Sequence, residues 1–454
     1  MSQRLKRIWA YLAVCAAMGV ISSAQTFTTL VNFDGTNDAY PDAPLVQATN
    51  GDLYGTTLGA PYSYGTIFKM TPAGALTTVY EFGASNPYPG AGLIQATNGD
   101  LYGTTGVYAH GTIFRITPQG VLATLYSFCA LTNCADGQEP AGLVQAANGK
   151  LYGTTQGGGA NGWGTVFEIT PGGTLTTLYS FIQAYGGANP GSGLLQAANG
   201  ILYGTTIFGA GVTYGGTIFG ITPSGGFTSL YSFPDTAEAF PNGLLQGING
   251  TLYGTTSNML GGTNDFGTIF KITPTAGLTT IHSFNMTDGA YPSGELIQAT
   301  NGNLYGTTSQ GGANGYGTIF EITPTGLLTT LHNFDGSDGA SPLAGLLQDT
   351  NGDLYGTTNR GGANSLGTIF KLSLGLAPFV KTLPTVGLVG STVKILGSDL
   401  TDATSVTFNG VPAAFTVVSA REISTTVPTG ATTGKVEVVT PSGTLISHVG
   451  FAVR

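Results

Sequence analysis

Residues 354–358 read Leu-Tyr-Gly-Thr-Thr, and this string occurs seven times in the 454-residue chain. Its tyrosines are Tyr54, Tyr102, Tyr152, Tyr203, Tyr253, Tyr305 and Tyr355, so one unit is about fifty residues long. A repeat of this length is typical of propeller blades or of solenoids. The fold class therefore depends on what each unit forms and on how the array ends.

Each unit contains four short runs rich in β-branched and aromatic residues, which favour strands. The first run reads like residues 344–348 and leads to Asn-Gly, which predicts a type I′ hairpin turn. Leu-Tyr-Gly-Thr-Thr is the second run. The third reads like residues 317–323, and a Pro-x-Gly turn connects it to the fourth, as at residues 328–334. We therefore expect four antiparallel strands in each unit.

The two ends of the array complement each other. A run of the fourth type, residues 27–33, precedes the first unit, whereas no such run follows the last third-type run at residues 367–372. A closed ring lets the N-terminal strand complete the last sheet and removes both unpaired edges. We predict an all-β, seven-bladed β-propeller closed by the N-terminal strand. A β-solenoid is the competing fold, and it would need capping segments that the sequence does not show.

Composition excludes several classes of function. Only 8% of the residues are charged, 73 are Gly, 41% are hydrophobic, and the net charge is −9. The acidic balance argues against a basic nucleic-acid-binding surface and against electrostatic binding to a membrane. We expect no nucleic-acid partner and no membrane insertion of the mature chain.

The first 24 residues resemble a secretory signal. Arg4, Lys6 and Arg7 precede an apolar run of about fourteen residues, which ends at Ser22-Ser23-Ala24. The alternative is a transmembrane anchor, for which the run is short. We expect a secreted or cell-surface protein. Because disulfides form after export, Cys129 and Cys134 are a candidate pair, with free thiols as the alternative.

The recurring motifs between Phe27 and Leu372 resemble the GloVer tandem repeat of bacterial surface proteins. The last segment changes pattern: five or more short alternating strands predict a small β-sandwich. Its Gly-x-x-Val-x-Ile-x-Gly and Val-x-Phe-Asn-Gly motifs resemble the IPT/TIG domain, an immunoglobulin-like module. That resemblance implies a spacer or adhesion role. The expected domains are residues 1–24 (signal peptide), 25–375 (propeller) and 376–454 (sandwich).

Alternating strand directions place the second-to-third and fourth-to-first loops on one face of the ring, and these loops are long and variable in length. Binding residues are usually found on such loops. One candidate ligand-binding set is the ring of mostly aromatic residues that ends the second-to-third loops: Tyr64, His110, Trp163, Tyr214, Phe266 and Tyr316, with Leu366 in the last unit. Packing between blades is the alternative role.

Acidic residues recur in the fourth-to-first loops, at Asp38, Asp136, Glu238, Asp288 and Asp338. Asp34 with Asp38, and Asp335 with Asp338, are candidate Ca²⁺ ligands, while Asx-turn formation is the alternative. Apart from this candidate Ca²⁺, we expect no cofactor. One Gln stands on every first strand, either lining a channel or satisfying backbone groups between blades.

No motif for nucleophilic or metal-dependent catalysis is present, and Glu295 is the only charge within the first-strand cores. Our main interpretation is a secreted, noncatalytic surface protein that binds a protein or glycan through the long-loop face. One alternative is a carbohydrate-active lyase or hydrolase that uses loop carboxylates such as Asp288 and Asp338. Another is a structural component of the cell envelope or matrix.

Overall fold

The computed structural model describes residues 25–59, 63–84, 87–106, 110–209, 215–234, 239–257, 266–273 and 277–454. The predicted signal, residues 1–24, lies outside them. The described chain is all-β apart from two one-turn helices, η1 (Thr132–Cys134) and α2 (Gln183–Gly186). In this part of the chain, no helix has the length and apolar character needed to cross a membrane.

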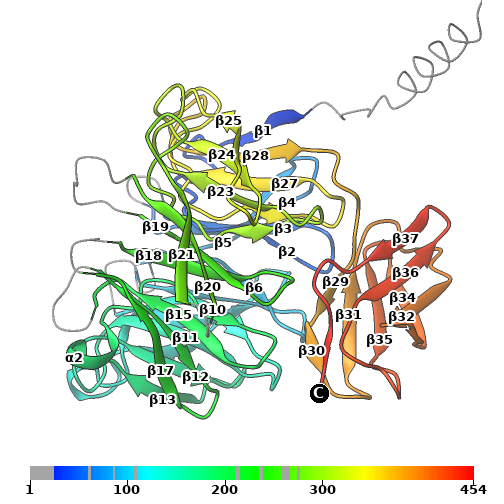
Figure 1. The fold of residues 1–454 in the computed structure, drawn as a ribbon, viewed down its shortest axis with the longest axis horizontal. Coiled ribbons are helices and arrows are strands. Elements are labelled where there is room, and N and C mark those ends of the chain that lie inside the picture. The colour runs from blue at the N-terminus through cyan, green and yellow to red at the C-terminus, as the bar shows by residue number, and fades with distance from the viewer. Residues whose placement is uncertain are drawn as a thin grey trace, which may run out of the picture.

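Seven four-stranded antiparallel sheets, of the kind that form propeller blades, account for the described repeat region (Figure 1). We number them by the order of their Leu-Tyr-Gly-Thr-Thr strands along the chain. Sheets 1 to 3 contain β2 (Val46–Gln47), β3 (Leu53–Thr57), β4 (Thr66–Met70) and β5 (Leu76–Glu81); β6 (Ile94–Gln95), β7 (Leu101–Thr105), β8 (Thr112–Ile116) and β9 (Leu122–Ser127); and β10 (Gln138–Gln145), β11 (Leu151–Gly157), β12 (Thr165–Ile169) and β13 (Leu175–Ser180). Sheets 4 to 6 contain β14 (Leu195–Gln196), β15 (Leu202–Thr206), β16 (Thr217–Ile221) and β17 (Phe227–Ser232); β18 (Pro241–Gln246), β19 (Leu252–Thr256), β20 (Thr268–Thr273) and β21 (Gly277–Ser283); and β22 (Ile297–Gln298), β23 (Leu304–Thr308), β24 (Thr318–Ile322) and β25 (Leu328–Asn333).

Sheet 7 combines strands from both ends of the repeat region. It contains β26 (Leu347–Gln348), β27 (Leu354–Thr358) and β28 (Thr368–Ser373), and its fourth strand is the N-terminal β1 (Thr26–Asn32). β1 runs antiparallel to β28, with Thr26 opposite Ser373 and Asn32 opposite Thr368. The first strand of the chain therefore pairs with a strand more than 330 residues later.

Each residue of the repeated second strand has a packing role, shown here for β23. Tyr305 is buried, and so are its counterparts in the other sheets. A Cβ atom on Gly306 would lie 2.6 Å from Cζ of Phe320, so this position accepts only glycine. The Thr308 hydroxyl lies 2.8 Å from that of Thr318 on the next strand. The string therefore repeats because each sheet makes the same close contacts.

Hydrophobic clusters join each sheet to its neighbour. Tyr54 and Ile67 of sheet 1 pack against Leu101 of sheet 2. Sheet 7 packs in the same way against sheet 1, where Tyr355 shares a cluster with Phe68. The core is thus shared between sheets, since each sheet alone is too thin to bury its apolar side chains.

Glutamines on the first strands form a chain of hydrogen bonds between sheets, which confirms the predicted role in satisfying backbone groups. Each backbone N–H donor follows the first strand of one sheet, and the Gln Oε1 acceptor belongs to the next sheet. The seven bonds join Thr49 to Gln95 (2.8 Å), Thr97 to Gln145 (2.9 Å), Ala147 to Gln196 (3.0 Å), Ala198 to Gln246 (2.8 Å), Ile248 to Gln298 (2.8 Å), Thr300 to Gln348 (3.2 Å) and Thr350 to Gln47 (3.3 Å). The last bond connects sheet 7 to sheet 1.

The predicted type I′ geometry of the Asn-Gly turns is wrong. In sheet 1, Gly51 has a positive φ of 86°, but Asn50 does not have a positive φ. The Gly51 N–H donates to Ala48 O at 2.8 Å, and Asn50 Oδ1 accepts the backbone N–H of Asp52 at 3.1 Å. The asparagine side chain therefore forms an Asx turn within a longer loop, which satisfies backbone groups that a two-residue hairpin would pair directly.

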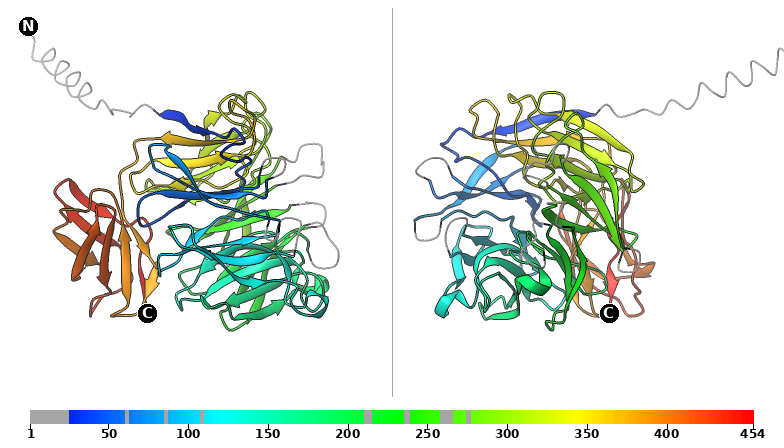
Figure 2. Two further views of the ribbon diagram at one scale, coloured as in Figure 1. Left: turned by 180° about the vertical axis from the view of Figure 1, so that it is seen from behind. Right: turned by 60° about the vertical axis from the view of Figure 1, so that its left-hand side comes forward.

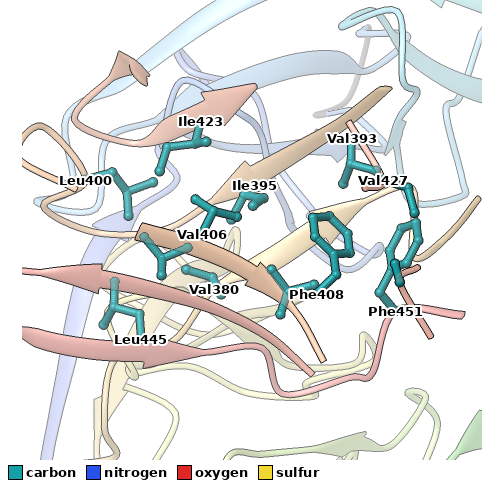
Figure 3. Packing of buried hydrophobic residues seen from close by; sticks show 13 residues of the cluster. Val380, Val393, Ile395, Leu400, Val406, Phe408, Ile423, Val427, Leu445 and Phe451 are labelled. Carbon is teal, nitrogen blue, oxygen red and sulfur yellow. The ribbon is translucent and has the colours of Figure 1, made fainter. Parts of the chain in front are cut away.

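The C-terminal domain is a two-sheet sandwich. One sheet has the order β29 (Lys381–Leu383), β31 (Thr392–Leu396), β35 (Glu422–Thr426) and β34 (Phe415–Ser419); the other has β33 (Val411–Pro412), β32 (Ser405–Phe408), β36 (Val436–Thr440) and β37 (Gly443–Ile446); and β30 (Val386–Gly387) pairs in parallel with β38 (Ala452–Val453). Figure 3 shows Ile395 and Ile423 of the first sheet facing Val406 and Phe408 of the second. This apolar layer holds the domain together.

The sandwich packs against the repeat domain along the side that carries the Asn-Gly turns. The left view of Figure 2 shows it beside the repeat domain. The backbone N–H of Phe379 donates to Thr350 O at 3.0 Å, and the hydroxyls of Thr350 and Ser398 lie 3.4 Å apart. A cleft of about 350 Å³ remains where Leu383 and Thr392 face the turns of sheets 2 and 3. The two domains are therefore in direct contact, and a spacer or adhesion role for the sandwich stays a prediction.

Candidate functional site

A central cavity of about 730 Å³ lies where the first strands of all seven sheets begin. In each sheet, the residue three positions before the first-strand glutamine lines the cavity. These seven residues are Pro44, Gly92, Gly142, Gly193, Gly243, Glu295 and Gly345. Glycine and proline leave space at this position in six sheets, whereas sheet 6 places a carboxylic acid there.

The Glu295 side chain fits because the neighbouring sheet presents glycine. A Cβ atom on Gly243 would overlap Oε1 of Glu295, so a larger residue there would displace the carboxyl group. On the other side, a Cβ atom on Gly345 would lie 2.8 Å from the Glu295 carbonyl oxygen. The two glycines therefore leave the space that Glu295 occupies.

Glu295 lines the cavity, and its side chain is exposed there. Burial raises the pKa of the Glu295 carboxyl to about 7. A carboxyl group disfavours ionisation where protein atoms replace solvent and no cation compensates its charge. At neutral pH, Glu295 is therefore poised between its protonated and ionised forms.

Other polar groups share the cavity. Burial also raises the pKa of Asp42, whose Oδ1 accepts a long hydrogen bond, 3.5 Å, from Asn359 Nδ2. Glu139 and Gln156 also line the wall, and Asn242 is held by its donation to the Pro292 carbonyl at 2.6 Å. Among the described residues that line the cavity, none is Lys, Arg or His. The site thus has carboxyl groups and no cationic side chain.

The cavity lies toward the long-loop end of the repeat domain. Its wall includes Thr105, Gly106, Gln156 and Ile207, each of which lies within one residue of the end of a second strand. The sequence predicts a ligand site on this face because of its loops. The wall nevertheless consists mainly of strand starts rather than of loop tips.

The predicted aromatic set does not line this cavity. Tyr64 and Tyr316 are exposed, Trp163 and Phe266 are half-buried in the clusters between sheets, His110 is exposed, and Tyr214 lies outside the described residues. Their backbone carbonyls accept N–H groups from the next sheet, as from Ser341 to Tyr316 at 3.0 Å. A ligand-binding role for these side chains stays a prediction.

Two of the four candidate Ca²⁺ ligands accept hydrogen bonds within their own loops. Asp34 Oδ1 accepts the N–H and hydroxyl of Thr36, and Asp335 Oδ1 accepts those of Ser337. These bonds lower the pKa of Asp34 and Asp335. Both loops therefore form Asx turns.

The other two candidates are bound to neighbouring strands. Asp38 accepts the Thr57 hydroxyl at 2.7 Å, and Asp338 Oδ2 lies 2.7 Å from His332 Nε2. Asp288 forms the same kind of pair with His282 at 3.0 Å. These carboxylates fix the loops between sheets, and Ca²⁺ binding by Asp34, Asp38, Asp335 and Asp338 stays a prediction. Of the other loop acids, Glu238 lies outside the described residues.

Cys129 and Cys134 form a disulfide across the loop that contains η1. These two sulfur atoms and a His110 ring nitrogen all lie within 4.8 Å of one another, close enough in principle to bind one metal ion. Sulfur atoms joined in a disulfide are not thiolate ligands, so this arrangement indicates a covalent link rather than a metal centre.

Two family models match the sequence. The Gloeobacter/Verrucomicrobia repeat matches residues 105–277 and 210–413, which together span more than half of the chain. The chain belongs to this repeat family. The IPT/TIG domain matches residues 379–450, within the sandwich. Both resemblances seen in the sequence are thus confirmed. No curated protein matches the sequence.

Solved structures similar to this Gloeobacter/Verrucomicrobia repeat protein include enzymes. A mutant puromycin hydrolase complexed with PGG is 12% identical with a TM-score of 0.49, over 89% of this chain and 57% of that one. A candidate 6-phosphogluconolactonase from Bacteroides fragilis is 18% identical with a TM-score of 0.46, over 67% and 86%. A candidate gluconolactonase is 11% identical with a TM-score of 0.40, over 78% and 94%.

These comparisons correct the main functional interpretation of the sequence. The solved structures carry the names of hydrolytic enzymes, which agrees with the enzymatic alternative and not with a noncatalytic binding protein. With identities of 11–18% and TM-scores below 0.5, they do not identify the reaction or the substrate of this repeat protein. Its chemistry is inferred instead from the cavity and from Glu295. The isolated charge of Glu295 is visible in the sequence, but the opening of its position into a cavity is not.

Proposed function

We propose that the seven sheets are the blades of one closed β-propeller, with β1 completing the last blade. Three features support closure: the pairing of β1 with β28, the cluster that joins Tyr355 to Phe68, and the bond from Thr350 to Gln47. The first feature reproduces, within sheet 7, the pairing of the third and fourth strands in the other sheets. The other two reproduce, between sheets 7 and 1, contacts that other neighbouring sheets make. The central cavity is then the axial channel of the ring.

We propose that this channel is the active site of a carbohydrate-active hydrolase in which Glu295 is the general acid–base. The observation that carries the proposal is the placement of Glu295, whose carboxyl enters the cavity at a position held by Gly or Pro in every other blade. Its pKa of about 7 matches the task, because proton transfer is most efficient when the catalytic pKa lies near the working pH.

The reaction needs water and no other reactant. The Glu295 carboxylate accepts a proton from a water molecule, the water oxygen bonds to the electrophilic carbon, and the bond to the leaving oxygen breaks. The proton then passes to that leaving oxygen. Asp42 supplies a second carboxyl in the same cavity, and paired carboxyls are the usual requirement of glycoside hydrolysis. A volume of about 730 Å³ is within the range of small-molecule sites.

Two observations refine the alternative reached from the sequence. Asp288 and Asp338 are engaged with His282 and His332 and do not line the cavity, so Glu295 replaces them as the catalytic candidate. A lyase that acts on uronic acids benefits from a cation beside the substrate carboxylate. The described cavity wall offers no Lys, Arg or His, which favours hydrolysis of a neutral substrate.

The test is a panel of 4-nitrophenyl glycosides, esters and sugar lactones with the purified chain. Once a substrate is found, we expect Glu295→Gln to lower kcat/KM by roughly 10²- to 10⁴-fold, the usual contribution of a general acid–base. Asp288→Asn is the matched control and should retain activity within about threefold. If Glu295→Gln keeps full activity, or if Asp288→Asn abolishes it, the assignment to Glu295 is wrong.

We also propose that the protein acts outside the cytoplasm. The leader-like pattern of residues 1–24 and the disulfide between Cys129 and Cys134 support export, since disulfides persist in oxidising compartments. Expression of the full chain in a bacterium should give a mature protein that begins at Gln25 outside the cytoplasm. Terminal sequencing that finds residues 1–24 retained would contradict this proposal.

A further inference from the structure

The sandwich contacts the Asn-Gly turns of sheets on different sides of the repeat domain. Arg421 lies beside Gly51 of sheet 1, and the Arg454 guanidinium lies beside Gly200 of sheet 4. The His448 ring lies against the backbone of Gln298 in sheet 6. In a ring of seven blades these sheets surround the axis, so a single domain that reaches all three must cross it.

Lys381 is at the centre of this junction. Its ammonium group donates to the Gln348 carbonyl of sheet 7 and, at 3.4 Å, to Gln47 Oε1 of sheet 1. It thereby joins the two glutamines that flank the seam between the first and last sheets. Asp349, which is fully buried, interacts electrostatically with Lys381 and Arg421 of the sandwich. Charged groups from both domains thus face one another where little water reaches them.

We propose that the sandwich closes the turn-side end of the axial channel, and we call it the stopper. Lys381 makes the contact that holds the stopper in place, and we call it the latch. This inference rests on the closed ring proposed above. The stopper leaves the long-loop face as the route by which ligands reach Glu295. It also explains why Lys381, in the first strand of the sandwich, directs its charge into the seam rather than into solvent.

The experiment measures how fast a maleimide labels Thr350→Cys, with the site identified by mass spectrometry. Thr350 is fully buried, and its hydroxyl lies 3.4 Å from that of Ser398 in the sandwich, so the stopper predicts labelling at least 100-fold slower than at exposed Ser442→Cys. Adding Lys381→Glu, which places a carboxylate against the Gln348 carbonyl and Asp349, should accelerate labelling at least tenfold. Lys69→Glu, an identical charge change on β4, should leave the rate unchanged.

A second buried position separates undocking from unfolding. Val166→Cys in β12 is far from the junction in sequence and should stay unreactive when Lys381→Glu is present. If Lys381→Glu also exposes Val166→Cys, the milder variant Lys381→Met distinguishes undocking of the sandwich from unfolding of the chain. This variant keeps the aliphatic stem but donates no hydrogen bond, and it should accelerate labelling of Thr350→Cys.

Two results would overturn the inference. Labelling of Thr350→Cys as fast as Ser442→Cys in an otherwise unchanged chain would show that the sandwich does not cover this face. No acceleration by Lys381→Glu or Lys381→Met would show that Lys381 is not the latch. Because labelling requires no substrate, a failure of the stopper is distinguishable from a failure of Glu295 catalysis.

Discussion

Replacement of Glu295 by Gln should stabilise the protein at alkaline pH and leave its stability unchanged in acid. Glu and Gln have similar shapes, but Gln does not ionise. Burial raises the pKa of Glu295 from 4.5 to about 7, so the unfolded chain loses this proton at lower pH than the folded one. The wild-type protein therefore loses stability as pH rises from about 4.5 to about 7, and the loss is constant above that.

The size of the effect follows from the shift. At 1.36 kcal/mol per pKa unit, the full shift corresponds to about 3 kcal/mol. Because the side chain is exposed to the cavity, water screens part of this cost, and we expect about 1–2 kcal/mol. For a chain of this length, that difference raises Tm by roughly 1–4 °C at pH 8.

The assay is thermal unfolding of Glu295→Gln and of the wild-type chain at pH 4.5, 6, 7 and 8. Asp402→Asn, at an exposed position of the sandwich, is the control for removal of one carboxylate. A Tm difference between Glu295→Gln and wild type that is the same at every pH would refute the reasoning. So would a variant that is less stable than wild type at pH 8, because the carboxylate would then have a stabilising partner.

Three further predictions concern the repeat domain. Phe33→Ala should lower the free energy of unfolding by about 3–5 kcal/mol in denaturant titrations, because this fully buried ring packs between sheets 7 and 1; a loss below 1 kcal/mol would contradict that packing. Gln95→Met should cost about 1–3 kcal/mol by leaving the buried Thr49 N–H unpaired, and an unchanged unfolding midpoint would count against the bond. Gly55→Ala should destabilise by at least 1–3 kcal/mol, since its Cβ would overlap an aromatic carbon of Phe68, whereas Gly83→Ala, with open space around it, should be neutral; equal effects would argue against close packing.

The repeat was readable from the sequence because each of its residues has a contact that is identical in every sheet. Tyr305 and Gly306 show this, since burial and close approach to an aromatic ring constrain both positions. The glutamines were readable for the same reason. When the same side chain makes the same contact in every unit, its regular spacing in the sequence is enough to predict its structural role.

The features that escaped prediction depend on contacts between segments distant in sequence. Glu295 stands out as a lone charge, but the space around it is created by Gly243 and Gly345, each about fifty residues away. The docking of the sandwich depends on Lys381 meeting Gln348 at the seam, which no local pattern encodes. The type I′ turn predicted at Asn50 is wrong because the Asn50 side chain takes the place of a backbone hydrogen-bond partner in the turn.

The pairing of β1 with β28 has a consequence for biosynthesis. At about 5–20 residues per second, a ribosome finishes β28 some tens of seconds after β1 has been made. During this interval the N-terminal strand is an open edge that any other nascent chain can occupy. A leader that keeps the chain extended until translocation would delay folding until both ends of the chain are in the same compartment. An incompletely folded, aggregation-prone intermediate would then not accumulate in the cytoplasm.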